Sequence, residues 1–202
     1  MNIYFSADCH FDHANIIRFC DRPFIKKGDL INGDWKSEEI KWQRCKWMNE
    51  EIIKRWNNKV SPDDLVYHIG DFSFKGNDSC KTFEDKLNGT IVHIKGNHDK
   101  NNGVKTYITS CLMEWGGLGF YVKHTPPEDN QIGTLEARIM SSVDLVLCGH
   151  VHQKWKHKYI NYNCNKKILC INVGQDVWNF EPVSVHSILK YIAKVRRGLV
   201  DE

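Results

Sequence analysis

Residues 91–99 read Ile91-Val92-His93-Ile94-Lys95-Gly96-Asn97-His98-Asp99, a short apolar run that ends in a cluster of polar side chains. The apolar part, residues 91–94, has the length and composition of a buried β-strand. Gly96 allows a tight turn and a close approach of other groups directly before the polar cluster. The stretch therefore predicts a strand whose carboxyl end presents an amide, an imidazole and a carboxylate.

Four more apolar runs, at residues 3–7, 65–69, 118–122 and 143–148, lead into side chains of the same kind. In chain order these side chains are Asp8 and His10, then Asp71, then His124, then His150 and His152. The carboxyl ends of strands in open α/β sheets are where ligands bind. Residues two apart in extended backbone point to one face, so the pairs Asp8–His10 and His150–His152 are expected to converge. Imidazole and carboxylate without thiolate suit Mn, Fe, Zn, Co or Ni.

Helices are predicted between the strands. The longest runs from about Ser37 to Asn57, with Ser37 as N-cap and two glutamates in the first turn. Its tryptophans and basic residues could stack on nucleic acid, but a helix packed on a sheet is the favoured interpretation. Shorter helices are expected at 14–20, 79–87, 134–142 and from Ser184 onward, further β-structure at 155–162 and 167–173, and an irregular excursion at 21–36. This alternation predicts a layered α/β domain.

Composition is that of a globular protein: 202 residues, 41% hydrophobic, 26% charged, with a net charge of +3. One domain over residues 1–202 is expected. No apolar run approaches the roughly 18 residues of a membrane span, and the first residues do not resemble a signal peptide. The eight cysteines form no C-x-x-C pair. Scattered cysteines of this kind are expected to be reduced thiols, so we expect a cytoplasmic protein without a membrane partner.

The order of the blocks, Asp8-x-His10, Gly70-Asp71, Gly96-Asn97-His98-Asp99, His124 and Gly149-His150-x-His152, resembles that of the calcineurin-like metallophosphoesterase superfamily. Residues 10–17, 22–24 and 178–184 further resemble its small stand-alone branch of bacteria and phages. The resemblance implies a four-layer α/β/β/α sandwich of two mixed sheets flanked by helices. It also implies a cofactor of two divalent transition metal ions, with manganese preferred and Fe, Zn, Ni or Co as alternatives.

Carried over by position, the resemblance implies which side chains hold these ions. The first ion would be held by Asp8, His10, Asp71 and His152, and the second by Asp71, Asn97, His124 and His150, with Asp71 bridging. A hydroxide between the ions would attack phosphorus, and His98 would protonate the leaving group. Asp99 is expected to cap a following helix or to orient its neighbours, ahead of a direct catalytic role.

The expected activity is hydrolysis of a small phosphoester, a nucleotide or a phosphodiester. Candidate substrate contacts are His13, Asn15 and Arg22, which lie close to the first block. A nuclease acting on DNA or RNA is the alternative, for which the basic region 36–59 with Trp35 and Trp42 could engage a strand. A non-catalytic interaction module is the third possibility. Protein phosphatase activity is not expected, because the second block continues as Phe72-Ser73-Phe74 and lacks the Asp and Arg of that branch.

Overall fold

Two mixed β-sheets form the centre of the computed structural model, which describes residues 1–74, 76, 78–129, 133–163 and 166–200. The first sheet has the strand order β11 (Val183–Ser184), β1 (Ile3–Ser6), β4 (Leu65–Ile69), β5 (Thr90–Ile94). The second has the order β6 (Ser110–Trp115), β7 (Leu118–Lys123), β8 (Leu145–Cys148), β10 (Lys166–Asn172), β9 (His157–Asn163). The first sheet is parallel except for its edge strand β11, and the second has a parallel centre with an antiparallel strand at each edge.

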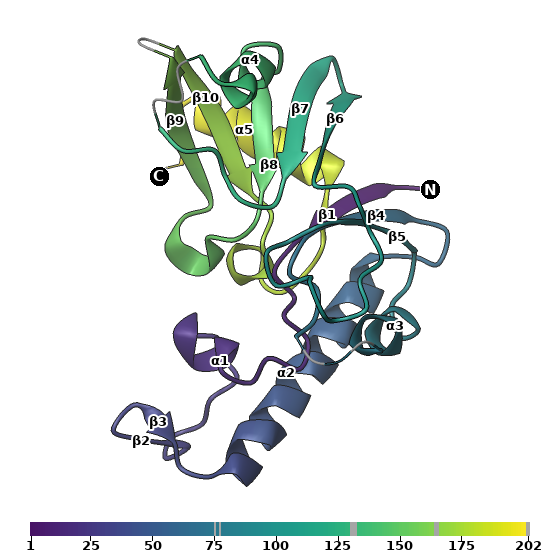
Figure 1. The fold of residues 1–202 in the computed structure, drawn as a ribbon, viewed down its shortest axis with the longest axis vertical. Helices are drawn as coiled ribbons and strands as arrows, with labels where there is room; N and C mark the ends of the chain where they lie inside the picture. Colours follow the sequence, from purple (N-terminus) through teal and green to yellow (C-terminus); the bar gives the residue numbers. More distant parts are fainter. Residues whose placement is uncertain (75, 77, 130–132, 164–165, 201–202) are drawn as a thin grey trace.

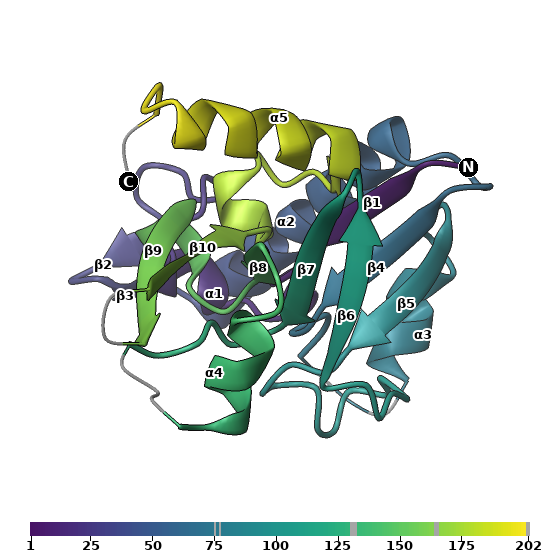
Figure 2. The same cartoon turned by 90° about the horizontal axis from the view of Figure 1, so that it is seen from above.

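Helices complete the layers. The long helix α2 (Glu38–Lys59) and the short α3 (Ser79–Glu84) share a core with the outer face of the first sheet. Helix α4 (Leu135–Met140) packs on the outer face of the second sheet. Between the sheets lies a second core to which α5 (Val185–Arg196) adds its apolar side. Figures 1 and 2 show α4 and α5 on opposite faces of the second sheet. The expected α/β/β/α sandwich is confirmed.

Each sheet contributes side chains to two hydrophobic cores, one on each of its faces, because the side chains along a strand alternate in direction. Phe5 and Ile69 of the first sheet face Leu145 of the second, whereas Tyr4 and Val66 in the same two strands face α2. Side chains of successive strand residues point to opposite faces, so strands buried on both sides are apolar throughout. The four-residue β8 is buried at every position, as this geometry requires.

Helix α2 forms as its sequence predicts. The Ser37 hydroxyl accepts a hydrogen bond from the Ile40 N–H at 3.2 Å, which satisfies one free donor of the first turn. Met48, Ile52 and Trp56 are fully buried, and the Trp56 indole N–H donates to the Asn88 carbonyl at 2.9 Å. The interpretation of α2 as a helix packed on a sheet is therefore correct for its carboxyl-terminal half.

Two hairpins differ from the sequence-based expectation. Residues 21–36, expected to be irregular, contain the short strands β2 (Leu30–Ile31) and β3 (Asp34–Trp35), joined by Asn32-Gly33 with φ of 52° and 80°. Strand β6 was not expected at all. It joins β7 through Gly116-Gly117, with φ of 61° and 75°. Asn-Gly and Gly-Gly are favoured in such two-residue turns because both positions need positive φ. Helix α1 (Ile16–Phe19) is shorter than expected.

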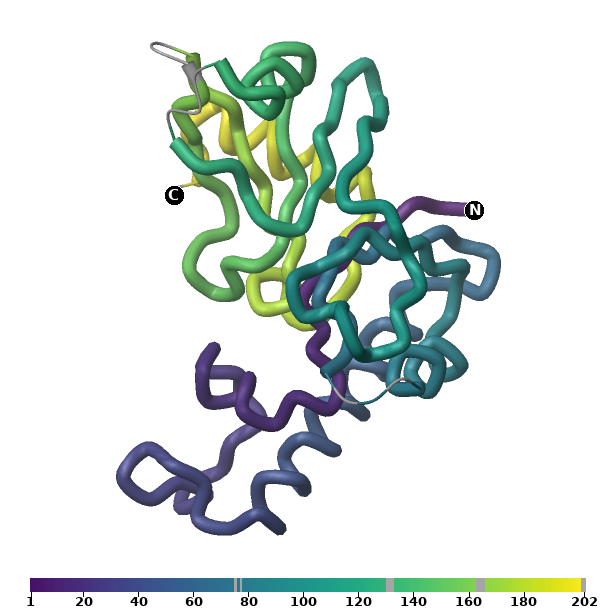
Figure 3. Tube along the Cα trace, in the orientation of Figure 1, coloured from purple at the N-terminus to yellow at the C-terminus, as the bar shows by residue number. Residues whose placement is uncertain are grey.

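Backbone hydrogen bonds continue past the strand ends and tie the following loops together. The Asp8 N–H donates to the Gly70 carbonyl and the His10 N–H to the Asp71 carbonyl, both at 3.0 Å. The Gly149 N–H donates to the His124 carbonyl at 2.9 Å in the second sheet. The trace in Figure 3 shows these loops meeting where the two sheets adjoin. The segments α1 and β2–β3 lie farther from the sheets, beside the amino-terminal end of α2. The polar blocks of the sequence are thereby brought together.

Two further expectations concern the chain as a whole. Seven cysteines in the described residues are free thiols, and Cys164 lies outside those residues. Across the described helices, none combines the length and the apolar character needed to cross a bilayer.

Candidate dimetal centre

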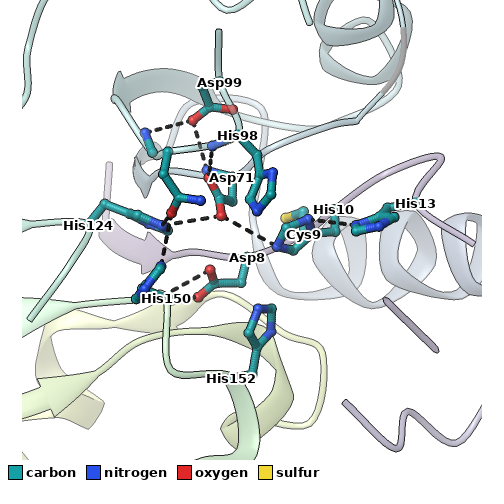
Figure 4. Close-up of polar contacts among 12 residues, drawn as sticks. Asp8, Cys9, His10, His13, Asp71, His98, Asp99, His124, His150 and His152 are labelled. Atoms are coloured by element: carbon teal, nitrogen blue, oxygen red, sulfur yellow. Dashed lines mark hydrogen bonds and ion pairs between the residues drawn. The ribbon is translucent and has the colours of Figure 1, made fainter. Parts of the chain in front are cut away.

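Two groups of potential metal ligands lie side by side where the sheets adjoin (Figure 4). Asp8, His10 and His152 offer donor atoms that all lie within 4.8 Å of one another, and so do Asp71, His124 and His150. Asp71 stands between the groups: its Oδ2 is 3.6 Å from His10 Nε2 and 3.2 Å from His124 Nε2. The structure thus gathers these side chains into two groups, which divide as the family resemblance implied.

Asn97 completes the second group. Its Oδ1 lies 3.0 Å from His124 Nε2 and 2.9 Å from His150 Nδ1. The amide oxygen is an acceptor without a proton to give, so it points its lone pairs at the place where the two imidazoles converge. All seven side chains expected to bind metal therefore lie at one site.

The backbone at this site is left-handed at five of the seven positions. Asp8, His10, Asp71, His150 and His152 have φ of 58°, 50°, 58°, 71° and 50°. Convergence of Asp8 with His10, and of His150 with His152, was expected from extended backbone, and that reason was wrong. The side chains meet because the chain turns sharply after each strand. Non-glycine residues in this region cost energy and cluster at functional sites.

Glycines beside the ligands leave space that a side chain would fill. A Cβ on Gly96 would lie 2.2 Å from Asp71 Oδ1, and one on Gly149 would lie 2.6 Å from Asp8 Oδ2. Neither glycine has a positive φ. Glycine is therefore needed at these positions for the close approach of the carboxylate and not for backbone freedom. The carboxylates of Asp8 and Asp71 are held against bare backbone as a result.

Hydrogen bonds fix which ring nitrogen of two histidines, His124 and His152, faces the centre. The His124 Nδ1–H donates to the Ile69 carbonyl at 2.8 Å, and the His152 Nδ1–H donates to Asp176 Oδ2 at 3.0 Å. Metal-binding histidines are commonly oriented in this way, with the other nitrogen left for the ion. His10 Nε2 is buried and has no hydrogen-bond partner among the described residues. A buried unpartnered nitrogen beside carboxylates fits two divalent ions held by nitrogen and oxygen ligands.

Burial and pairing shift the pKa values of the acidic ligands. Burial raises the pKa of Asp8 to about 6 against the opposing charges of His124 and His152. Burial also acts to raise the pKa of Asp71, but the hydrogen bond and charge of His124 outweigh it and hold that pKa below its usual value.

The pKa values of two ligand histidines are raised by their carboxylate partners. Burial opposes the charged form of His124, yet the hydrogen bond with Asp71 raises its pKa to about 9. For His152, burial is outweighed by the Asp176 hydrogen bond, and its pKa rises to about 10. In the metal-free protein, ion pairs of the protonated His124 with Asp71 and of the protonated His152 with Asp176 therefore hold the site together.

His98 and Asp99 occupy different environments. His98 is exposed; its N–H donates to Asp71 Oδ1 at 2.9 Å, and its ring packs edge-on against that of His10 with centroids 5.5 Å apart. Asp99 is buried, and its carboxylate accepts from the N–H groups of Asp71, Phe72 and Gly96 at 2.8 to 3.1 Å. Asp99 thus orients its neighbours, as one of the two expectations held. It caps no helix, because the next helix or strand along the described chain is the strand β6.

Two of the three candidate substrate contacts line a cavity beside the site, and the third is enclosed in the protein. His13 is half-buried, with Nδ1 3.2 Å from His10 Nδ1 and its ring stacked on Phe74 at 3.9 Å. Asn15 accepts a hydrogen bond from the Trp35 indole at 3.1 Å and lines a small cavity with His13. Arg22, however, has a side chain that is 0% exposed and an ion pair with Asp176. Arg22 supports the site from within and cannot reach a substrate from there.

Asp176 is the residue that the sequence pattern could have indicated but that was not singled out. It follows β10 in the stretch Val173-Gly174-Gln175-Asp176, at the same sheet edge as the other blocks. It links Arg22 to His152 and is almost fully buried. Burial acts to raise its pKa, but the charge of Arg22 outweighs burial and keeps that pKa low. A polar residue after a buried strand was the available signal.

Comparison with known proteins agrees with this geometry. Residues 47–189 match the model of the calcineurin-like phosphoesterase superfamily domain. The chain is 34% identical over 194 residues to the uncharacterized protein MJ1445 of Methanocaldococcus jannaschii, covering 95% of this chain and 92% of that protein. This chain therefore belongs to the calcineurin-like phosphoesterase superfamily.

Solved structures extend the comparison. A protein of unknown function from Aquifex aeolicus, AQ665, is similar with a TM-score of 0.62 and 24% identity, covering 94% of this chain and 98% of that one. It shares the fold. A novel archaeal phosphodiesterase is 23% identical over 86% of this chain and 84% of its own, with a TM-score of 0.39.

Proposed function

We propose that this protein hydrolyses a small phosphoester, a nucleotide or a phosphodiester, with two divalent transition metal ions as cofactor. The observation that carries the proposal is the pairing of two three-donor groups about Asp71, with the unpartnered nitrogen of His10 buried between them. When bound, two such ions would supply an activated water and offset the negative charge of the phosphoryl group. Membership of the superfamily supports metal-dependent phosphoester hydrolysis as the class of reaction.

The protein's own groups hold the ions. Asp8, His10, Asp71 and His152 would hold the first, and Asp71, Asn97, His124 and His150 the second. Nitrogen and oxygen donors without sulfur suit Mn, Fe, Zn, Ni and Co, and the family resemblance makes manganese the first candidate for both positions. Cys9 is next to two ligands in sequence, but its Sγ lies 3.2 Å from His68 Nε2 and 3.0 Å from Gln175 Nε2, away from the centre.

His98 is the group placed to deliver a proton. It is exposed at the mouth of the site, and its backbone is tied to the central carboxylate of Asp71. Its imidazole has contacts with the rings of His10 and His13, at centroid distances of 5.5 and 6.3 Å. In this position it would protonate the departing alkoxide, a step worth roughly 10²–10⁴ in rate for poor leaving groups.

Surfaces on two sides of the site support a substrate with an anionic and an aromatic part. A cavity of about 330 Å³ next to Asn97 and His124 is lined by Lys95, Lys100 and Lys123. Lys123 is also paired with Glu136, which offsets part of its charge. Lysine side chains near a phosphoryl site attract further phosphate groups.

The other side is aromatic. A cavity of about 100 Å³ is lined by His13, Lys41, Trp42 and Phe74, and Phe74 is 42% exposed. Nucleobases stack on such ring faces irrespective of sequence. A phosphodiester with a nucleoside on one side and a further phosphate on the other would use both surfaces.

A nuclease is the second candidate, and the same two surfaces favour it. Lys41 and Trp42 belong to the amino-terminal part of α2, where the basic stretch begins, and they reach the cavity beside His13. A strand bound there would depend strongly on salt, because its binding releases counterions from several phosphates. A small substrate would show a much weaker salt dependence.

Initial rates on p-nitrophenyl phosphate and bis-p-nitrophenyl phosphate test the proposal. Chelator-stripped protein would be supplied with Mn, Ni, Co, Zn or Mg, and the salt dependence of hydrolysis of a short oligonucleotide would be measured in parallel. Metal-restored hydrolysis, faster on the diester, is the expected result. Metal binding without hydrolysis of any of these substrates would contradict the proposal and favour a non-catalytic interaction module.

A further inference from the structure

A third cluster of metal-binding side chains lies on the outer side of the first sheet, apart from the dimetal centre. Cys80 and Glu84 are four residues apart on α3, so they share one face of that helix. His93 points toward them from the edge strand β5. His93 Nε2 lies 3.9 Å from Cys80 Sγ and 2.5 Å from Glu84 Oε1, and the three donor atoms all lie within 4.8 Å of one another.

We propose that Cys80, Glu84 and His93 bind a zinc ion. A thiolate, an imidazole and a carboxylate form a donor set typical of zinc, which takes four ligands in a tetrahedron. The set differs in kind from the dimetal centre, where no sulfur is offered. The Cys80 thiol loses its proton to solvent as the sulfur–zinc bond forms, and His93 binds in its neutral form.

The surroundings leave one coordination position free. All three side chains line a cavity of about 520 Å³, together with Lys105 and Thr106. Water or a small anion could enter from this cavity as the fourth ligand. Without metal, Glu84 pairs with His93 and also accepts a hydrogen bond from the Cys80 thiol, so the carboxylate already draws the three groups together. A zinc ion would replace the thiol proton and bind all three donor atoms.

Packing holds His93 in place for this role. The Thr106 hydroxyl donates to the His93 carbonyl at 2.8 Å, and the His93 ring packs edge-on against Phe72 with centroids 4.9 Å apart. Fixing the ring before the ion arrives lowers the entropic cost of binding.

The cluster is joined to the dimetal centre through backbone and carboxylate contacts. The Cys80 N–H donates to the Asn102 carbonyl at 2.9 Å, and the Asn102 amide donates to Asp99 Oδ1 at 2.7 Å. Asp99 in turn holds the backbone of Asp71. A zinc ion between α3 and β5 would therefore connect α3 and β5 to the segment that carries the second metal block.

Cobalt substitution tests the site independently of catalysis. Chelator-stripped, reduced protein titrated with Co²⁺ should develop a thiolate-to-cobalt charge-transfer band, which Zn²⁺ then removes. The band should be lost in Cys80→Ser and retained in Cys111→Ser, a matched control for a half-buried thiol elsewhere. Cys20→Ser is a second control, because the Cys20 thiol hydrogen-bonds to His152, a candidate ligand of the dimetal centre.

The Asp71→Asn variant separates this proposal from the proposed function. It should retain the band even though the dimetal centre is impaired. If Cys80→Ser does not fold, His93→Gln serves in its place and should weaken cobalt binding at this site about tenfold or more. Absence of the band in the wild-type protein, or its persistence in Cys80→Ser, would overturn the zinc site.

Discussion

Arg22 and Asp176 form an ion pair that is wholly enclosed by protein. The distance from Arg22 Nε to Asp176 Oδ1 is 2.8 Å, and the two side chains are 0% and 2% exposed. The remaining Arg22 donors contact the backbone of the first metal block: Nη2 donates to the Asp8 carbonyl at 2.7 Å and Nη1 to the Cys9 carbonyl at 3.1 Å. Since Asp176 also orients His152, one arginine connects ligands that are far apart in sequence.

Arg22→Met should therefore destabilise the protein without acting through substrate binding. It removes the guanidinium from the buried Asp176 carboxylate, which then keeps only His152 as a cationic partner, and breaking such a buried pair costs about 3–5 kcal/mol in free energy of unfolding. Urea denaturation of the metal-free protein measures this loss. Lys46→Met, which removes an exposed pair with Glu50, is the control and should change stability by less than about 1 kcal/mol. A stable Arg22→Met protein with a raised KM alone would indicate a substrate contact instead.

Gly96→Ala should damage the dimetal centre through a single methyl group. The added Cβ would lie 2.2 Å from Asp71 Oδ1 and 2.4 Å from the Asp71 nitrogen, so the central carboxylate must move. We expect a loss of about 1–3 kcal/mol in stability and a fall of about tenfold or more in metal affinity. Isothermal titration with Mn²⁺ measures the affinity.

Gly119→Ala is the matched control for that substitution. Gly119 lies in β7 without a positive φ, and its Cβ would make ordinary contacts at 3.5 Å or more. Metal affinity should be unchanged in this variant. Equal effects of the two substitutions would show that the close approach of Gly96 to Asp71 is unimportant.

Much of this arrangement could be predicted because it depends on local rules. Asp8, Asp71 and Asn97 each follow a buried apolar strand, and strand ends in a layered α/β fold meet at a shared edge. The left-handed backbone at His10 and His150 could not be predicted, since no glycine or asparagine marks those positions and only the surrounding contacts hold them there.

Other misses have different causes. Arg22 was placed near the substrate from its nearness to His10 in sequence, whereas its position is decided by Asp176, which is 154 residues away. Long-range pairs of this kind leave no trace in one sequence. The β2–β3 and β6–β7 hairpins were missed although Asn32-Gly33 and Gly116-Gly117 gave a usable signal.

His98→Ala should separate metal binding from proton delivery. The side chain is not among the donor groups, so the bound metal content should match that of the wild type. Turnover should fall by roughly 10²–10⁴ on substrates with a poor leaving group and far less on p-nitrophenyl esters, whose leaving group needs no proton. Equal losses across a series of leaving groups would remove His98 from the role of general acid.

Metal binding should release protons and strengthen as pH rises. In the metal-free protein, the Asp71 hydrogen bond outweighs burial and raises the pKa of His124 to about 9, and the Asp176 hydrogen bond likewise raises that of His152 to about 10. At neutral pH both imidazoles hold a proton that an ion must displace, so affinity should increase up to about these pKa values. Calorimetric titrations in buffers of different ionisation enthalpy measure the release. A binding enthalpy independent of buffer would contradict it.

The most direct test of the central claim follows bound metal and hydrolysis in the same sample. Chelator-stripped wild-type protein and the Asp71→Asn variant would be titrated with Mn²⁺, with bound metal measured by mass spectrometry and the rate measured on bis-p-nitrophenyl phosphate. If hydrolysis needs both ions, wild-type activity should appear only as the second ion binds, and Asp71→Asn should neither fill both positions nor turn over. Full hydrolysis by metal-free protein, or by Asp71→Asn, would contradict it.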